Sequence, residues 1–239
     1  MKLNHLKTYL VLVLIITATS IKAQDLLFGA GFGGGTFSMS STKEFNKVIS
    51  SGLPFKAELT SNFPPYFFLK AEALYSFPKT FAIGVNFTST STGARLSYAD
   101  YSGSYKFDNV QNGLFPGIKI LVGKAPGKVT GINFGLEGGV ALSKMKIDEE
   151  TKVFDQTASN ITNVSSMGFY IQPGVYYFLV SKSQFRLSAN ASYYIGIEKG
   201  YHLPNQKDAQ LINPQTGKQI KPQWDGVRIG VTAYWVLRK

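Results

Sequence analysis

The chain has 239 residues, which is enough for one large β domain or two small domains, and it contains no cysteine. The missing cysteines exclude disulfides, thiolate metal sites and a lipid anchor of the kind attached to a cysteine. The formal net charge is +11, but the basic residues are scattered singly, so neither a basic run nor a basic stripe supports nucleic-acid binding.

The N-terminal residues are typical of a secretory signal. Basic residues open the chain, residues 9–16 form an apolar run, and Ala23 precedes a suitable cleavage point. The apolar run is shorter than the roughly 20 residues that a membrane-spanning helix needs. We therefore predict a signal peptide over residues 1–23, cleaved on Sec-dependent export, and one domain over residues 24–239. An uncleaved N-terminal anchor is the alternative.

After the signal, apolar residues alternate with polar residues and glycines at the period of two that β-strands require. The connections between the alternating segments are short at three places and long at four, as in transmembrane barrels. In chain order, the pattern predicts strands over residues 26–39, 66–77, 81–88, 114–122, 131–142, 169–180, 185–197 and 228–235.

The long connections are polar. The first contains residues 41–51, whose apolar residues recur at helical spacing and whose Ser41 and Glu44 fit a capping box, so we expect a short helix there. The other three are expected to be loops, over residues 89–109, 144–165 and 198–223.

Two further segments alternate, residues 53–59 and 95–107, and counting them as strands would give ten. Eight strands place every short connection on one side of the molecule and every long one on the other. The expected fold is therefore all-β, an antiparallel up-and-down transmembrane β-barrel of about eight strands, with ten strands as the alternative.

The last strand resembles the C-terminal signal by which outer-membrane β-barrels engage the barrel-assembly machinery. Arg228, Gly230, Ala233 and Trp235 stand at the polar, glycine, hydrophobic and aromatic positions of that signal. Ala233 is smaller than the residue that is usual at the hydrophobic position. Two basic residues, Arg238 and Lys239, come after the last aromatic residue. A terminal strand would be an exposed edge in an open sheet, so we expect it to pair with the first strand and close the barrel.

The polar face of the predicted strands carries few charges, of both signs. A face in contact with water would carry more, so we expect this face to line the lumen and the apolar face to contact lipid. Eight strands leave an interior that side chains just fill, and the charges are expected to pair there and plug the lumen. The predicted lumenal charge network consists of Lys70, Glu72, Lys119, Glu137, Arg186 and Arg228.

Aromatic residues gather near the short connections, where they suggest a girdle at the membrane interface; ordinary strand propensity is the alternative. Taken together, the chain resembles the small eight-stranded outer-membrane barrels of the OmpA and OmpX type, and is similar to uncharacterised barrels of the Bacteroidetes. Residues 91–95 and 100–103 are similar to loop sequences of that family. The resemblance implies the outer membrane of a Gram-negative bacterium, with contacts to outer-membrane lipid and lipopolysaccharide. It implies no activity.

No motif of catalysis accompanies this pattern. His202 is the one histidine after the predicted signal, and Asp208 is near it in sequence, but neither belongs to a nucleophile motif. We expect no catalytic residue, cofactor or metal site. The first hypothesis is a structural or surface-interaction barrel that acts through its external loops. The alternatives are a narrow channel or carrier of small hydrophobic molecules, a soluble periplasmic lipocalin-like binder and, last, an outer-membrane enzyme.

Overall fold

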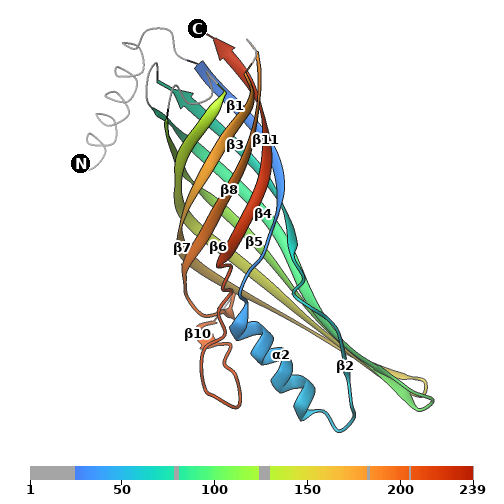
Figure 1. Ribbon diagram of the computed structural model, residues 1–239. Coiled ribbons are helices and arrows are strands. Elements are labelled where there is room, and N and C mark those ends of the chain that lie inside the picture. Colours follow the sequence, from blue (N-terminus) through green and yellow to red (C-terminus); the bar gives the residue numbers. More distant parts are fainter. Residues whose placement is uncertain (1–24, 78–80, 124–129, 182–183, 205, 239) are drawn as a thin grey trace, which may run out of the picture.

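In the computed structural model, which describes residues 25–77, 81–123, 130–181, 184–204 and 206–238, eight antiparallel strands form a closed ring (Figure 1). Each strand pairs with its neighbour in the ring, and β8 returns to β11. The eight strands are β1 (Asp25–Gly35), β3 (Tyr66–Ser76), β4 (Phe81–Ala99), β5 (Gly103–Gly123), β6 (Gly131–Val153), β7 (Gln156–Ser181), β8 (Phe185–Glu198) and β11 (Gly226–Arg238).

The terminal strand closes the barrel against the first strand, as predicted. β1 and β11 pair along their whole common length, from Asp25 opposite Arg238 to Gly35 opposite Arg228. The prediction of eight strands in an up-and-down order is confirmed. The predicted signal peptide lies outside the described residues.

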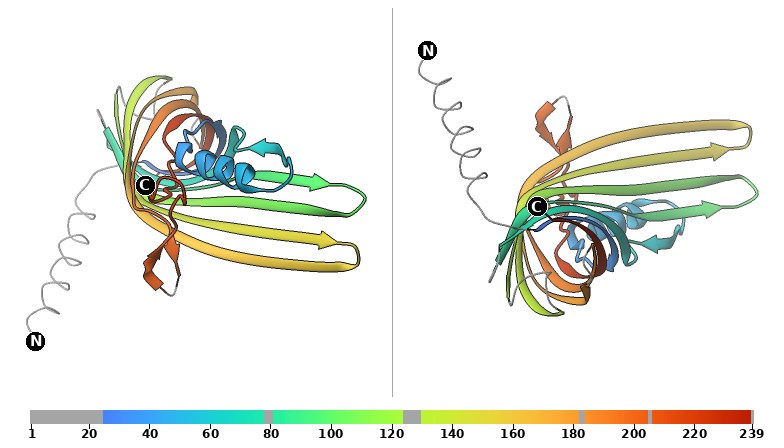
Figure 2. Two further views of the ribbon diagram at one scale, coloured as in Figure 1. Left: turned by 90° about the horizontal axis from the view of Figure 1, so that it is seen from below. Right: turned by 90° about the horizontal axis from the view of Figure 1, so that it is seen from above.

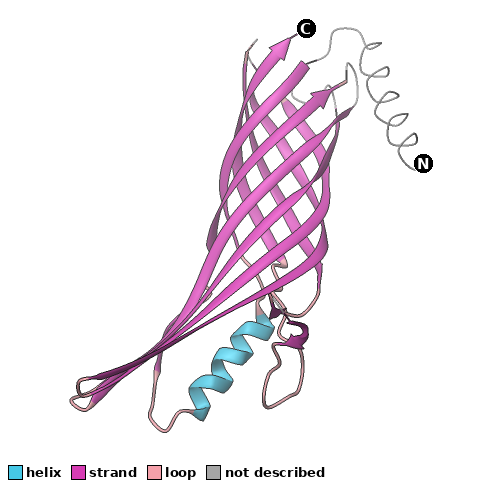
Figure 3. Cartoon of the chain, turned by 180° about the vertical axis from the view of Figure 1, so that it is seen from behind, coloured by secondary structure: helices cyan, strands magenta, loops and turns pink. Residues whose placement is uncertain are grey.

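We call the end of the barrel with the three short connections the turn end and the opposite one the loop end. At the loop end β4, β5, β6 and β7 continue far beyond the other strands, as two joined hairpins that project to one side (Figures 2 and 3). We call this part the extension. Residues 89–109 and 144–165, predicted to be loops, are therefore mostly strand. The segment 95–107, counted in the ten-strand alternative, is a continuation of two ring strands.

The extension folds as sheet because apolar residues still alternate along it, although its overall composition is polar. Leu96, Phe107, Met145 and Val164 face one side and are buried. They pack with Phe45 of the helix α2 (Ser40–Gly52) and with Tyr201 and Ile220 of the last long connection. The concave face of the extension thus has its own apolar core outside the barrel.

The remaining elements lie at the loop end. They are α2, β2 (Glu58–Asn62), which pairs with β4, and the short strands β9 (His202–Leu203) and β10 (Gln206–Gln210). Among the described residues, no helix has the length and apolarity needed to cross a membrane.

The predicted helix is present, but its predicted capping box is wrong. The residue before it, Met39, has a left-handed backbone (φ 42°), and no side chain of the first turn caps the helix. Instead the side-chain oxygen of Gln223 accepts hydrogen bonds from the Ser41 amide (2.7 Å) and the Ser40 hydroxyl (2.9 Å). The start of α2 is therefore fixed by the last long connection, 183 residues away in sequence from Ser40.

The two faces of the barrel wall are the inverse of those of a soluble barrel. A lipocalin hides its apolar face inside, whereas here the apolar side chains stand outside and the polar side chains are buried in the lumen. The outward apolar side chains, which we call the belt, include Phe32, Leu69, Val85, Phe87, Leu114, Ile118, Ile120, Phe134, Leu136, Leu142, Met167, Phe169, Ile171, Ile195, Ile229 and Trp235.

Aromatic rings occupy the turn-end margin of this belt. Phe81, Tyr177, Phe185 and Trp235 are exposed there, and the rings of Phe77 and Phe81 stack with their centroids 4.1 Å apart. This arrangement is that of an interfacial girdle.

Inward-facing glycines make room for the large polar side chains of the lumen. A Cβ atom at Gly135 would lie 2.3 Å from the ring of Tyr176, and one at Gly29 would lie 2.8 Å from the ring of Tyr234. Both distances are too short for real contacts, so these two positions require glycine as long as the tyrosines occupy the lumen.

Candidate functional site

Four of the six predicted lumenal charges meet in the middle of the barrel, and we call them the quartet. Lys70 and Glu72 come from β3, Lys119 from β5 and Glu137 from β6, and all four are buried. The Nζ atom of Lys119 lies 2.9 Å from a Glu72 oxygen and 3.7 Å from a Glu137 oxygen. The Nζ atom of Lys70 lies 3.4 Å from Glu72 and forms a short contact with Glu137.

The quartet balances two cations against two anions, and neutral side chains satisfy the rest. The hydroxyl of Tyr234 donates to Glu72, and that of Tyr176 donates to Glu137. The Asn86 amide nitrogen is 2.6 Å from the second oxygen of Glu137. A carboxylate that is removed from water loses its hydration, so several hydrogen-bond donors must compensate it.

The fifth predicted charge, Arg186, lies apart from the quartet. It is buried and forms an ion pair with Asp25, the first described residue of β1. Sequence reasoning missed Asp25 because it is only the second residue after the predicted cleavage site, before the alternation of β1 is established.

The sixth, Arg228, lies towards the loop end and has no carboxylate within ion-pair distance among the described residues. Its guanidinium donates to the Tyr66 hydroxyl (2.7 Å) and to the Gln172 side-chain oxygen (3.0 Å). It also faces the rings of Phe115 and Tyr194, at 4.7 and 4.2 Å from their centroids. Cation–π contacts and neutral acceptors thus replace the acidic partner expected from sequence.

Aromatic rings fill the lumen between Arg228 and the loop end. Trp224, in the last long connection just before β11, is fully buried, and its indole nitrogen donates to the Ser143 hydroxyl (2.8 Å). Its ring makes edge contacts with Phe37, Tyr66 and Phe115. Sequence reasoning missed Trp224 because it lies between the predicted loop and the predicted last strand, where no alternation marks it.

The backbone around Trp224 is held from two sides. Gln223 has a left-handed backbone (φ 53°), and its amide donates to Glu198 at the end of β8 (2.7 Å). Glu198 lies past the last outward apolar side chain of β8.

The residues of the predicted assembly signal alternate across the wall of β11. Arg228 and Gly230 face the lumen, whereas Ala233 and Trp235 belong to the outward face.

His202, the one histidine after the predicted signal, lies apart from the quartet. It lies in β9 at the loop end and pairs in register with Ser165 of β7. No group of three histidine or acidic side chains suited to a metal ion occurs in the described part of the chain.

Comparisons with known proteins add solved structures only. No protein-family description and no curated protein matches the chain. The crystal structure of Ail, the attachment invasion locus protein of Yersinia pestis, aligns with a TM-score of 0.35 and 12% identity over 91% of this chain and 100% of its own. That of Neisserial surface protein A (NspA) aligns with a TM-score of 0.37 and 10% identity over 89% of this chain and 97% of its own. A structure of Ail with the heparin analogue sucrose octasulfate gives 0.34 and 15%, over 90% and 98%. Likeness at this level carries no argument about function.

Proposed function

We propose that the protein is an integral outer-membrane β-barrel with a plugged lumen, which acts through its loop end at the cell surface and not as an enzyme. The outward belt supports placement in lipid, since these side chains would otherwise face water. The same belt disfavours the soluble lipocalin-like alternative. The basic composition supports contact with the phosphates of lipopolysaccharide. We also propose that Arg228, Gly230, Ala233 and Trp235 engage the barrel-assembly machinery.

The buried side chains of the lumen support a plug over a channel or a carrier. The quartet occupies the middle, and Trp224 with its aromatic neighbours occupies the loop-end half. A carrier of small hydrophobic molecules would need an apolar cavity, whereas the charged and aromatic side chains in this lumen contact one another.

The proposed surface role is based on the extension. Its outer strand β7 is paired with β6 as far as Gln156, but β8 pairs with β7 only from Gly168 towards the turn end. Among the described residues, strand partners on this edge stop at Ser165, opposite His202. Residues 156–164 therefore present a free strand edge, which is a template for pairing with an extended segment of another molecule.

Shortening the extension tests this role. Glu149 pairs opposite Asn160, so residues 149–160 can be replaced by an Asn-Gly turn without a change of register below them. The matched control replaces only the two turn residues, Phe154 and Asp155, by the same Asn-Gly turn and keeps the hairpin at full length. Heat-dependent gel mobility verifies that both barrels are folded.

The measurement is adherence of cells displaying each variant to surfaces coated with protein or polysaccharide. We expect the shortened variant to lose the adherence that wild type and the control share. Equal adherence of all three, or no adherence by wild type, would contradict a surface role for the extension.

A further inference from the structure

The buried charges of the barrel do not sum to zero. In the part of the chain that the structure describes, four cationic and three anionic side chains are buried. The quartet is neutral, and so is the pair of Arg186 with Asp25, so the excess positive charge belongs to Arg228. Neutral acceptors and aromatic rings stabilise its guanidinium but leave the charge itself without an opposite partner, which is unfavourable away from water.

The guanidinium of Arg228 also has one donor group to spare. Its Nε atom donates to the Tyr66 hydroxyl and its Nη1 atom to the Gln172 side-chain oxygen. The Nη2 atom is buried and has no hydrogen-bond partner among the described residues. This atom can therefore donate charge-assisted hydrogen bonds to a further, anionic acceptor.

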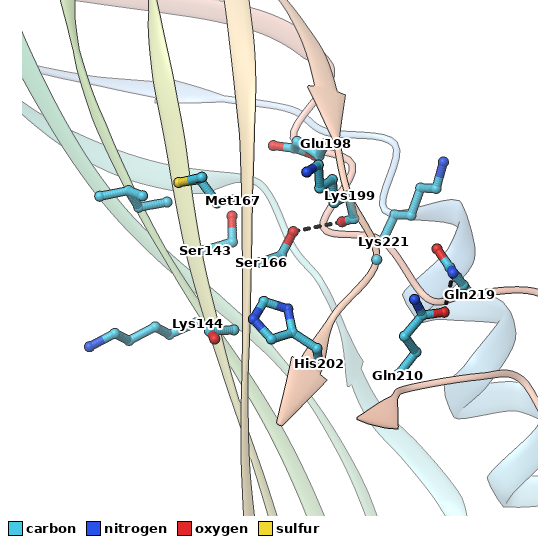
Figure 4. Close-up of a pocket in the computed structure, with 13 residues that line it drawn as sticks. Ser143, Lys144, Ser166, Met167, Glu198, Lys199, His202, Gln210, Gln219 and Lys221 are labelled. Carbon is cyan, nitrogen blue, oxygen red and sulfur yellow. Dashed lines mark hydrogen bonds between the residues drawn. The ribbon is translucent and has the colours of Figure 1, made fainter. Parts of the chain in front are cut away.

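The carboxylates of the loop end do not supply this acceptor. Glu198 lies where β8 ends, beside a cavity of about 750 Å³ in the wall (Figure 4). It is linked to Arg228 through the Tyr194 ring, whose hydroxyl donates to one Glu198 oxygen (3.3 Å). The other oxygen accepts from the Gln223 amide (2.7 Å). Asp225 accepts from a backbone amide of β8 (2.8 Å), so both acids have partners of their own.

The side chain of Asn190 borders the same region of the lumen. Asn190 pairs opposite Gly230, which is the inward position next to Arg228 on β11, and such positions are roughly 7 Å apart. A Cβ atom at Gly230 would lie 3.4 Å from the Asn190 Oδ1 atom, so the amide lies over the glycine. Since this amide forms no hydrogen bond with the described residues, its NH₂ group is a second free donor.

We propose that the lumen binds one small monovalent anion of the halide type, held by Nη2 of Arg228 and the side-chain amide of Asn190. A single negative charge neutralises the single excess positive charge, whereas sulfate or hydrogen phosphate would leave a net negative charge in the same buried space. A halide also accepts hydrogen bonds from any direction, which suits donors on two different strands. The anion would fasten β11 to the aromatic side chains of the plug. This inference goes beyond the proposed surface role and requires only the folded barrel.

The first experiment measures urea unfolding of the full mature protein, folded in detergent micelles, by tryptophan fluorescence. The solutions contain sodium chloride, sodium bromide or sodium gluconate at equal ionic strength, and urea replaces guanidinium chloride because the latter adds chloride. We expect the wild-type midpoint to rise by a constant increment for each tenfold increase in halide, as mass action requires of a ligand that binds the folded state. Equal midpoints in halide and gluconate would overturn the proposal.

Two variants test the site itself. Arg228→Met removes the excess charge, and Asn190→Asp supplies a fixed carboxylate in place of the anion, so both should lose the dependence on halide. The matched control is Arg95→Met, which removes an exposed arginine of the extension and should keep the wild-type dependence. Each protein is refolded from the denatured state, because Arg228 also belongs to the predicted assembly signal. If Arg228→Met does not fold, Asn190→Asp decides, and an unchanged halide dependence of that variant would overturn the site.

A second measurement uses the wild-type protein alone. Crystals grown in bromide should show an anomalous-scattering peak inside the barrel, within hydrogen-bond distance of the Arg228 guanidinium. Diffraction that shows bromide elsewhere on the molecule but not at Arg228 would contradict the proposal.

Discussion

At the scale of single residues, each buried charge is compensated by an opposite charge, by hydrogen bonds or by aromatic rings. In the quartet, each carboxylate accepts from a lysine, and each also accepts from a tyrosine hydroxyl. A buried ion pair contributes little net stability by itself, but removal of one partner leaves the other charge without compensation.

The first prediction concerns Glu137→Gln. The change leaves Lys70 and Lys119 facing the single charge of Glu72, and we expect it to lower the free energy of unfolding by ~3–5 kcal/mol. Denaturant unfolding of the lipid-reconstituted protein measures the effect. The control is Glu150→Gln, which removes an exposed carboxylate from the same strand β6 and should leave the unfolding midpoint nearly unchanged. If the two variants unfold alike, the quartet does not stabilise the barrel.

Single residues also show where sequence reasoning stops. Strand alternation placed all six charges on one face, because alternation determines which side of a strand a residue occupies. It could not give their partners, since the pairing of Arg186 with Asp25 and of Arg228 with aromatic rings depends on the register and tilt of strands distant in sequence.

At the scale of elements, β5 contains both environments of the outward face. Its Ile118 lies in the belt and is 57% exposed, whereas Val110 faces the same side in the extension and is 38% exposed. The two residues differ in surroundings but not in strand or face, so they form a matched pair for testing where lipid ends.

The second prediction follows from this pair. Ile118→Arg places a cation near the middle of the belt and should cost ~2–4 kcal/mol in lipid, with reduced assembly into the membrane. Val110→Arg should assemble like wild type, because water surrounds the extension. The amount of each variant that shows heat-dependent gel mobility in membrane fractions is the measurement. Equal loss of both, or greater loss with Val110→Arg, would contradict the assignment of the belt.

The elements at the loop end were the least predictable part of the fold. The composition of residues 89–109 and 144–165 is polar, and polar segments between strands are usually loops. Here they remain strands because α2 and the last long connection bury one face of them, with Phe45, Tyr201 and Ile220 as the covering side chains. Residues 95–107 do alternate, but the packing that covers them is tertiary and cannot be predicted from local sequence.

At the scale of the whole molecule, the barrel combines an apolar exterior, a lumen lined by buried polar and aromatic side chains, and a loop end joined by hydrogen bonds. α2 and the last connection are joined through Gln223, and the same connection inserts Trp224 into the barrel. We propose that these side chains occupy the path that a channel would need, and that other molecules bind on the outside of the extension.

The most direct test of this account is the conductance of the purified, folded protein in planar lipid bilayers. We expect stable insertion, verified by heat-dependent gel mobility of the same sample, without steady conductance, because the proposed plug consists of the quartet and the aromatic side chains around Trp224. Glu137→Gln should lower stability and leave the bilayer non-conducting. Steady, ion-selective conductance by the wild-type protein, with a selectivity that Glu137→Gln alters while stability is unchanged, would contradict the account and identify the barrel as a channel.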